Sequence, residues 1–299
     1  MIRPCRIHQP QPADRFVSAP DGLKLHYVEY GSSLDAGAPV VCLPGLTRSA
    51  EDFEPLARAL AFGGRKRRRV LALDYRGRGK SEWDRKWENY NLGVENADIL
   101  SLLDAVEIRD AIVVGTSRGG LHAMTFAAAR PTLLRAVVLN DVGPVVEPLG
   151  LMRIKSYVGK MPQPRNWDEA VDIVKATMSA QFTGLSQRDW EGYARRTFEE
   201  KNGKFVGRSD PKLAKTLAEV GPDMKRIELW PQFEAMARVP TLAIRGENSD
   251  LLSVETLQEM TRRCPNCESW VVPGQGHAPL LTNSITIERI RTFVERVGF

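Results

Sequence analysis

The segment around Ser117 constrains the fold more than any other part of this 299-residue chain. An apolar run at 112–114 stops at Gly115, and an alanine-rich stretch that suits a helix occupies 121–130. This order predicts a strand, a very tight turn and a helix, because side chains at Gly115 and Gly119 would collide with neighbouring backbone. The serine hydroxyl is then held clear of the sheet, at the apex of the turn.

A Gly-x-Ser-x-Gly pattern also occurs by chance, so the rest of the chain must decide its meaning. One interpretation is a nucleophile elbow, in which Ser117 attacks a substrate. The alternative is an ordinary turn between a strand and a helix, with the serine as a helix cap.

Strands and helices alternate along most of the chain. Apolar runs typical of buried strands occur at 40–43, 70–73, 112–114, 134–139 and 241–244, and a further strand is expected at 269–272. Helical spacing is found at 51–61, 92–106, 121–130, 254–264 and 285–297. The alternation predicts an α/β fold with a parallel sheet covered on both faces, which binds ligands beyond the carboxyl ends of its strands.

The alternation breaks at Gly143, and only helical patterns follow as far as about residue 238. The clearest helical stretches are 167–182 and 189–201, with a further one at 212–220. We therefore expect 143–238 to be a helical lid over the strand ends, inserted after the sixth strand. The core domain would comprise 14–142 and 239–299.

The net charge of +5 comes largely from the basic run at 65–69. No aromatic residues interleave this run and no nucleic-acid module is apparent, so we expect a solvated loop and no nucleic-acid partner. The start of the chain lacks an apolar core of signal-peptide length, and no window is apolar enough for a membrane span. We expect a loose leader at 1–13 and a cytoplasmic protein without a membrane partner.

The cysteines are too few for a disulfide-built fold: Cys5, Cys42, Cys264 and Cys267. The last two have redox or zinc spacing, but no second pair or histidine set accompanies them. We interpret them as part of a helix-to-strand turn. The chain also lacks a dinucleotide or phosphate-binding glycine motif, so neither a metal nor another cofactor is implied.

A nucleophilic serine needs a base to take its proton and a carboxylate to orient that base. The chain has four histidines. His8 lies in the leader, His26 in an early strand at the expected sheet edge, and His122 on the helix after the serine. His277 lies in a glycine-rich loop after the last strand, so elimination favours it as the base.

The acid is expected between serine and histidine in chain order. Asp250 follows the strand after the lid and satisfies that order directly. Asp141 ends the preceding strand and also satisfies it, although we prefer to interpret it as a helix cap or a lid anchor. The sequence therefore favours Asp250 and leaves Asp141 open.

Taken together, residues 14 to 299 resemble the α/β-hydrolase fold superfamily. The resemblance rests on five motifs in register: Pro44-Gly45-Leu46, Asp74-x-Arg76-Gly77-x-Gly79-x-Ser81, Gly115-x-Ser117-x-Gly119-Gly120, Gly246-x-x-x-Asp250 and Gly276-His277. It implies a mostly parallel, doubly wound, eight-stranded sheet. It also implies that Ser117 is the nucleophile, Asp250 the acid and His277 the base. The backbone amides of Leu46 and Arg118 would form the oxyanion hole.

A serine at the elbow argues against epoxide hydrolases and haloalkane dehalogenases, whose relatives carry aspartate there. Esterases, lactonases, carbon–carbon bond hydrolases, perhydrolases and acyltransferases remain. Arg118 departs from the residues more usual after the nucleophile. Its guanidinium would either bind a substrate carboxylate or, as we prefer, pair with an acid on the lid or a neighbouring loop.

The leading hypothesis is a serine hydrolase that cleaves a small acyl ester or lactone through an acyl-enzyme. A carbon–carbon bond hydrolase of aromatic degradation would use the same three residues. A slow or non-catalytic small-molecule receptor is the alternative of another class. Trp167, Phe182 and Trp190 are tentative apolar walls of the substrate pocket, although they would equally serve to pack the lid. The natural substrate and the oligomeric state stay open.

Overall fold

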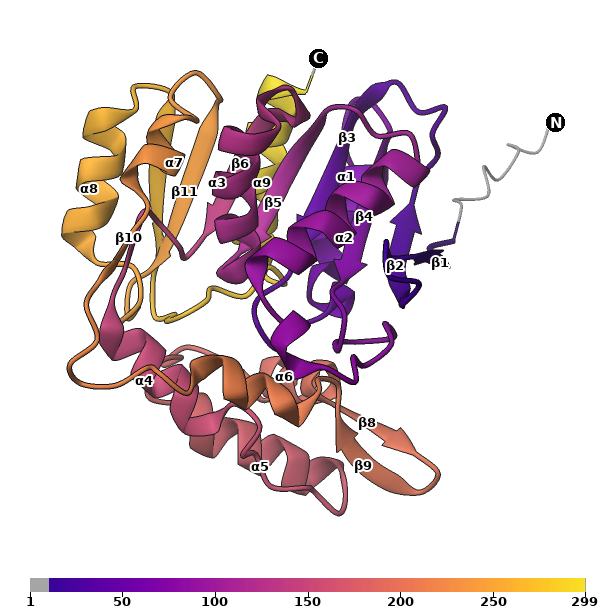
Figure 1. Ribbon diagram of the computed structural model, residues 1–299, viewed down its shortest axis with the longest axis vertical. Coiled ribbons are helices and arrows are strands. Elements are labelled where there is room, and N and C mark those ends of the chain that lie inside the picture. Colours follow the sequence, from indigo (N-terminus) through magenta and orange to yellow (C-terminus); the bar gives the residue numbers. More distant parts are fainter. Residues whose placement is uncertain (1–10, 299) are drawn as a thin grey trace, which may run out of the picture.

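The computed structural model describes residues 11–298. Most of the expected leader, with Cys5 and His8, lies outside this range, and the first strand begins at Ala13. Strands run roughly side by side above a separate group of helices in Figure 1.

Eight strands form the main sheet in the order β1-β2-β4-β3-β5-β6-β11-β12. Their bounds are β1 Ala13–Ser18, β2 Lys24–Tyr30, β3 Gly37–Leu43, β4 Arg68–Asp74, β5 Ala111–Thr116, β6 Leu134–Asn140, β11 Thr241–Gly246 and β12 Cys267–Val272. The pairings β1–β2 and β2–β4 are antiparallel, and every pairing from β4 to β12 in the sheet order is parallel. The prediction of a mostly parallel, eight-stranded sheet is therefore confirmed.

Helices cover both faces of this sheet. Helices α1 (Glu54–Phe62) and α9 (Ser284–Val297) pack on one face. The other face carries α2 (Leu92–Ala105), α3 (Arg118–Ala129), α7 (Trp230–Glu234) and α8 (Val254–Arg263). The sheet is thus doubly wound, as the alternating pattern predicted.

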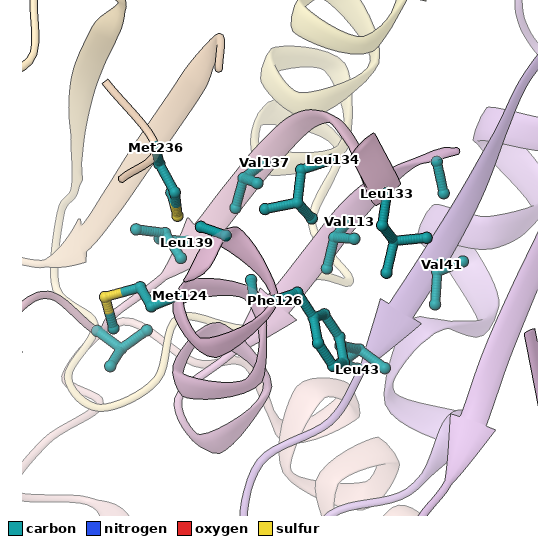
Figure 2. Close-up of a cluster of buried hydrophobic side chains, with 14 of the residues drawn as sticks. Val41, Leu43, Val113, Met124, Phe126, Leu133, Leu134, Val137, Leu139 and Met236 are labelled. Carbon is teal, nitrogen blue, oxygen red and sulfur yellow. The ribbon is translucent and has the colours of Figure 1, made fainter. Parts of the chain in front are cut away.

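The core has two layers, one on each face of the sheet, and alternate residues of each strand point into different layers. Val41 and Val113 point into the layer with α3, together with Met124 and Phe126, as Figure 2 shows. Cys42, the neighbour of Val41 in β3, points to the opposite layer. Successive strand residues face opposite sides, so a strand apolar on both faces must lie inside the sheet.

Within residues 143–238, which we call the insertion, the three main helices and a hairpin form a separate group at one end of the sheet, whereas α7 packs on the sheet itself (Figure 1). The main helices are α4 (Pro148–Tyr157), α5 (Trp167–Met178) and α6 (Gln187–Thr197). A short antiparallel pair, β7 (Val145–Val146) with β10 (Ile227–Glu228), lies where the insertion leaves and rejoins the core. The expected helix at 212–220 is a 3-10 helix, Pro211–Leu217.

The expectation of helices alone in the insertion is wrong, because β8 (Phe198–Lys201) and β9 (Lys204–Gly207) form a hairpin. The predicted helix at 189–201 ends at Thr197 instead. Asn202 and Gly203 take the turn with φ values of 51° and 71°. An Asn-Gly pair favours this two-residue turn, so the sequence did carry the signal.

The basic run is only partly the solvated loop that we expected. Residues 65–67 are exposed, but Arg68 is buried at the start of β4 and Arg69 donates a hydrogen bond to Glu29. The two late cysteines lie in the helix-to-strand turn between α8 and β12, as predicted, and both are buried free thiols. Within residues 11–298, no helix has both the length and the apolar composition needed to cross a bilayer.

Candidate active site

Ser117 lies at the sharp turn between β5 and α3. Its backbone has φ 52° and ψ −113°, a conformation that non-glycine residues rarely adopt. A Cβ added to Gly115 would lie 2.5 Å from backbone atoms of Gly119, and one added to Gly119 would lie 2.1 Å from the Leu43 carbonyl oxygen. Both glycines are therefore required for the strained turn, for the reason that the sequence suggested.

The structure brings Ser117, His277 and Asp141 into one hydrogen-bonded row. His277 Nε2 lies 2.8 Å from Ser117 Oγ, and His277 Nδ1 lies 2.7 Å from Asp141 Oδ2. The neutral imidazole that carries its hydrogen on Nδ1 satisfies both contacts, because Nε2 then accepts from the serine hydroxyl. Asp141 is fully buried, whereas the hydroxyl of Ser117 faces a cavity.

The expectation that Asp250 lies against His277 is wrong. Its carboxylate instead accepts two hydrogen bonds from Arg153 of α4, at 2.6 and 2.8 Å. Asp141 occupies the place beside the histidine because it directly follows β6, next to the turn that holds Ser117. Asp141, which the sequence left open as the second candidate for the acid, is therefore the residue in contact with His277.

Asp141 accepts hydrogen bonds from the last residue of β11 and from the loop that follows this strand. Its Oδ1 accepts from the amide of Gly246 at 2.6 Å, and its Oδ2 accepts from the Ser249 hydroxyl at 2.6 Å. The backbone of Asp141 has φ 57°, so the residue turns sharply out of the strand. These two donors fix the orientation of the carboxylate beside the His277 ring.

The insertion supports the histidine loop through Gln181, a residue that the sequence analysis missed. Gln181 Oε1 accepts from the amide of His277 at 3.0 Å, and its side chain packs on Gly276, where a Cβ would lie 2.1 Å from the same oxygen. A glutamine between two helices gave no local signal of this contact.

The two amides expected to form an oxyanion hole flank the serine. Arg118 is the first residue of α3, where an amide has no partner within the helix. Leu46 lines the cavity beside Ser117. Among the hydrogen bonds of residues 11–298, none uses the amide hydrogen of either residue. An oxyanion hole built from these two residues would need both amides unpaired.

The Arg118 side chain does not line the cavity. Its Nε donates to Glu95 on α2 at 2.5 Å, so the preferred ion pair is present, with an acid on a core helix rather than on the insertion or a loop. Glu95 also accepts from Arg78 at 2.8 Å, and Arg78 Nε donates to the carbonyl of Leu46 at 2.8 Å. One buried carboxylate thus connects both residues of the expected oxyanion hole.

Glu95 is fully buried, and burial alone would favour its neutral form. The guanidinium groups of Arg78 and Arg118 outweigh that effect and hold the pKa of Glu95 well below its usual range. His122, also fully buried, lies 3.2 Å from the same carboxylate, yet burial lowers its pKa. The histidine on α3 is therefore a packed, neutral group.

The remaining histidine and the glycine-rich loop at 74–81 serve the fold. His26 is buried in β2, one strand in from the edge, where Nδ1 lies 2.7 Å from Asp74 and Nε2 lies 2.9 Å from Asp14. Arg76 of the loop pairs with Asp98, with Nε 2.7 Å from the carboxylate. In the part of the chain that the structure describes, no group of three metal-binding side chains gathers.

A cavity of about 530 Å³ opens above Ser117 and His277, between the core and the insertion. Its volume is in the usual range for small-molecule sites. Apolar lining comes mainly from the insertion and the histidine loop: Ile154, Val158, Met161, Met178, Phe198, Leu280 and Leu281. The oxyanion loop contributes Gly45 and Leu46.

The expected aromatic walls are not part of this lining. Phe182 and Trp190 are buried in the core of the insertion, with ring centroids 6.5 Å apart, and Trp167 packs edge-on against Phe205 at 4.9 Å. These residues pack the insertion, which was the alternative in the sequence analysis. Sequence could not separate the two roles because both favour large apolar side chains at helical spacing.

The chain belongs to the α/β-hydrolase fold family, whose model matches residues 38–284. Among its relatives is the 3-hydroxybutyrate-oligomer hydrolase of Cupriavidus necator, 31% identical, with 90% of this chain and 92% of that protein covered. The 2-(acetamidomethylene)succinate hydrolase of Mesorhizobium japonicum is 27% identical, with coverages of 87% and 89%. A solved α/β hydrolase from Novosphingobium aromaticivorans is 37% identical, with a TM-score of 0.88 over 96% of this chain and 99% of that one. The family and these relatives show that the chain is a hydrolase.

Proposed function

We propose that this protein is a serine hydrolase that cleaves a small ester or lactone through an acyl-enzyme. The observation that carries the proposal is the row Ser117–His277–Asp141, with its serine end in the cavity. The named relative that acts on hydroxybutyrate oligomers, which are esters, supports an ester substrate.

In the proposed reaction, Ser117 Oγ attacks the carbonyl carbon while His277 Nε2 takes the hydroxyl proton. Asp141 stabilises the resulting imidazolium. The amides of Leu46 and Arg118 bind the oxyanion of the tetrahedral intermediate. His277 then returns the proton to the leaving alcohol, which leaves an acyl group on Ser117. A water molecule, activated by the same histidine, hydrolyses that ester and restores the serine.

A pair of aspartate variants tests the assignment. Asp141→Asn should lower kcat for p-nitrophenyl butyrate by about 10⁴-fold, because the amide cannot hold the histidine in the required tautomer. Asp250→Asn, the matched control, should stay within about threefold of the wild type, since its partner Arg153 is outside the row. Ser117→Ala should abolish turnover while circular dichroism shows a retained fold.

The opposite ranking of the two aspartate variants would return the acid role to Asp250. Retained turnover in Ser117→Ala would overturn the proposal altogether. Faster turnover of a dienone acid than of any ester or lactone would favour carbon–carbon bond cleavage by the same row.

A further inference from the structure

The cavity is lined by more positive than negative side chains, in addition to its apolar residues. Apart from His277, the charged side chains that line it within residues 11–298 are Arg48, Asp52 and Arg196. Two guanidinium groups face one carboxylate, so the set has a surplus of one positive charge. A buried or half-buried cation without an equivalent anion is costly, which calls for an explanation.

One carboxylate is shared between the two arginines. Arg48 donates to both oxygens of Asp52, at 2.7 and 2.6 Å, and also to the hydroxyl of Thr197 at 2.9 Å. Arg196 Nε lies 3.2 Å from an Asp52 oxygen that Arg48 already uses. In the described chain, Asp52 is the only acid within ion-pair distance of Arg196.

Other ion pairs between the insertion and the core have no such surplus. Arg153 faces Asp250 one to one. Arg208 lies between two acids, 3.0 Å from Glu51 and 3.5 Å from Glu199. The excess of guanidinium charge is therefore specific to the side of the insertion that faces the cavity.

Both arginines are accessible from the cavity and belong to elements near the serine. Their side chains are 18% and 16% exposed. Arg48 follows the oxyanion loop: a Cβ added to Gly45 would lie 3.3 Å from Arg48 Cγ and 3.8 Å from Ser117 Cβ. Arg196 comes from α6 of the insertion. Burial lowers the pKa of Arg196, as expected for a cation whose partner is shared.

We propose that Arg48 and Arg196 form a subsite for a substrate carboxylate, so that the preferred substrates are esters or lactones that also carry a free carboxylate. A planar guanidinium binds a carboxylate through parallel hydrogen bonds, and a second anion would balance the surplus charge. The apolar lining receives the carbon chain between the carboxylate and the scissile ester. The proposal rests on the proposed function and names its substrate class.

Matched ester pairs test the subsite. Mono-p-nitrophenyl glutarate and p-nitrophenyl valerate have acyl chains of the same length, with and without the charge. A second pair, 4-acetoxybutyrate and its primary amide, places the charge on the alcohol side. We expect the wild type to favour the anionic member of at least one pair in kcat/KM by about 10- to 100-fold, the range of a charge-assisted hydrogen-bonded contact.

Arg196→Gln should remove that preference, so that the anionic and neutral members of each pair have similar kcat/KM values. Arg195→Gln is the matched control on the same helix, because Arg195 stacks on Trp167, 4.4 Å from the ring, outside the cavity. It should leave the preference intact. Equal turnover of both members of both pairs by the wild type, or a preference that survives in Arg196→Gln, would overturn the subsite.

A binding measurement separates this proposal from the proposed function. Calorimetry with the Ser117→Ala variant should detect 4-acetoxybutyrate or glutarate, and Arg196→Gln in that background should weaken binding by about tenfold or more. Absence of any ester turnover in the wild type, with this binding retained, would overturn the hydrolase and keep the subsite. If the wild type turns over neutral esters, but Ser117→Ala binds the anionic compounds equally well with and without Arg196→Gln, the hydrolase stands and the subsite is overturned.

Discussion

Two clusters in this molecule share one design, a single carboxylate between two arginines. Behind the elbow, Glu95 lies between Arg78 and Arg118. In the cavity, Asp52 lies between Arg48 and Arg196. We call these the sealed cluster and the cavity cluster.

The clusters differ in the groups that surround their surplus positive charge. In the sealed cluster, backbone carbonyls accept further guanidinium hydrogens: Arg78 donates to Leu46 at 2.8 Å and to Arg76 at 2.6 Å, while its Nη2 is buried without a partner among the described residues. The acid of the cavity cluster is 23% exposed, and its arginines face open volume. The same charge pattern therefore fixes backbone in one place and leaves binding capacity in the other.

The largest effect is expected from Glu95→Gln. The variant leaves the fully buried guanidinium of Arg78 and the partly exposed one of Arg118 without their anion, and breaking a buried pair typically costs about 3–5 kcal/mol in the free energy of unfolding. Its kcat should fall with little change in KM, because Arg78 and Arg118 support the two oxyanion donors rather than the substrate. Urea unfolding and steady-state kinetics at pH 7 measure both effects, and unchanged stability would break the distinction between the clusters.

Acid should weaken the sealed cluster through His122. Burial lowers the pKa of His122 from 6.5, despite the opposing influence of Glu95, so the unfolded chain binds this proton first as the pH falls. Stability from this group is present above pH 6.5 and is lost below it, by at most about 1.4 kcal/mol per pH unit.

The variant His122→Gln isolates this effect. Urea unfolding at pH 7 and pH 5.5 should show a smaller loss of stability in the variant than in the wild type. The separate contribution of Glu95, whose depressed pKa stabilises the fold above 4.5, is lost only at lower pH and is common to both proteins. Parallel losses in the two proteins would show that folding does not lower the pKa of His122.

The smallest effect on stability is expected from Asp52→Asn. This ion pair is partly exposed, so its loss should cost about 1 kcal/mol or less in the free energy of unfolding. Freed guanidinium groups should lower KM for the anionic ester by a few-fold, about the effect of one extra charged hydrogen bond. A cost similar to that of Glu95→Gln would make the two clusters equivalent.

Local patterns were sufficient for the fold, the elbow and the histidine. The order of apolar runs and helical spacings determines a doubly wound sheet, since each buried strand needs helices on both faces. The glycines around Ser117 reveal the turn because the steric requirement is local. His277 could be predicted as the base because the chain has only four histidines and the other three lie in less suitable places.

The identity of the acid could not be read from chain order. Asp141 and Asp250 both lie between the serine and the histidine. The fold chooses Asp141 through its position beside the β5 turn, while Arg153, 97 residues from Asp250 in the chain, takes up the other carboxylate. Such a long-range pairing leaves no mark within either segment.

The Arg118 ion pair was inferred in kind, but its partner was not. Glu95 lies on a helix 23 residues earlier, and its burial depends on packing that periodicity alone does not reveal. The hairpin of the insertion is a different case. Its Asn-Gly turn was visible in the sequence and was overlooked within a stretch of helical spacing.

The contact of Gln181 with the amide of His277 makes the insertion more than a cover. Any motion that carried this glutamine away from the core would break its hydrogen bond to the loop that presents the imidazole, although Asn140 would still hold that loop through the carbonyl of Pro279. The position of the insertion is therefore one of the factors that fix the imidazole. A chimaera with the insertion of another hydrolase would need an equivalent acceptor in that insertion. Without one, the amide of His277 would lose its hydrogen-bond partner as well as the native cavity lining.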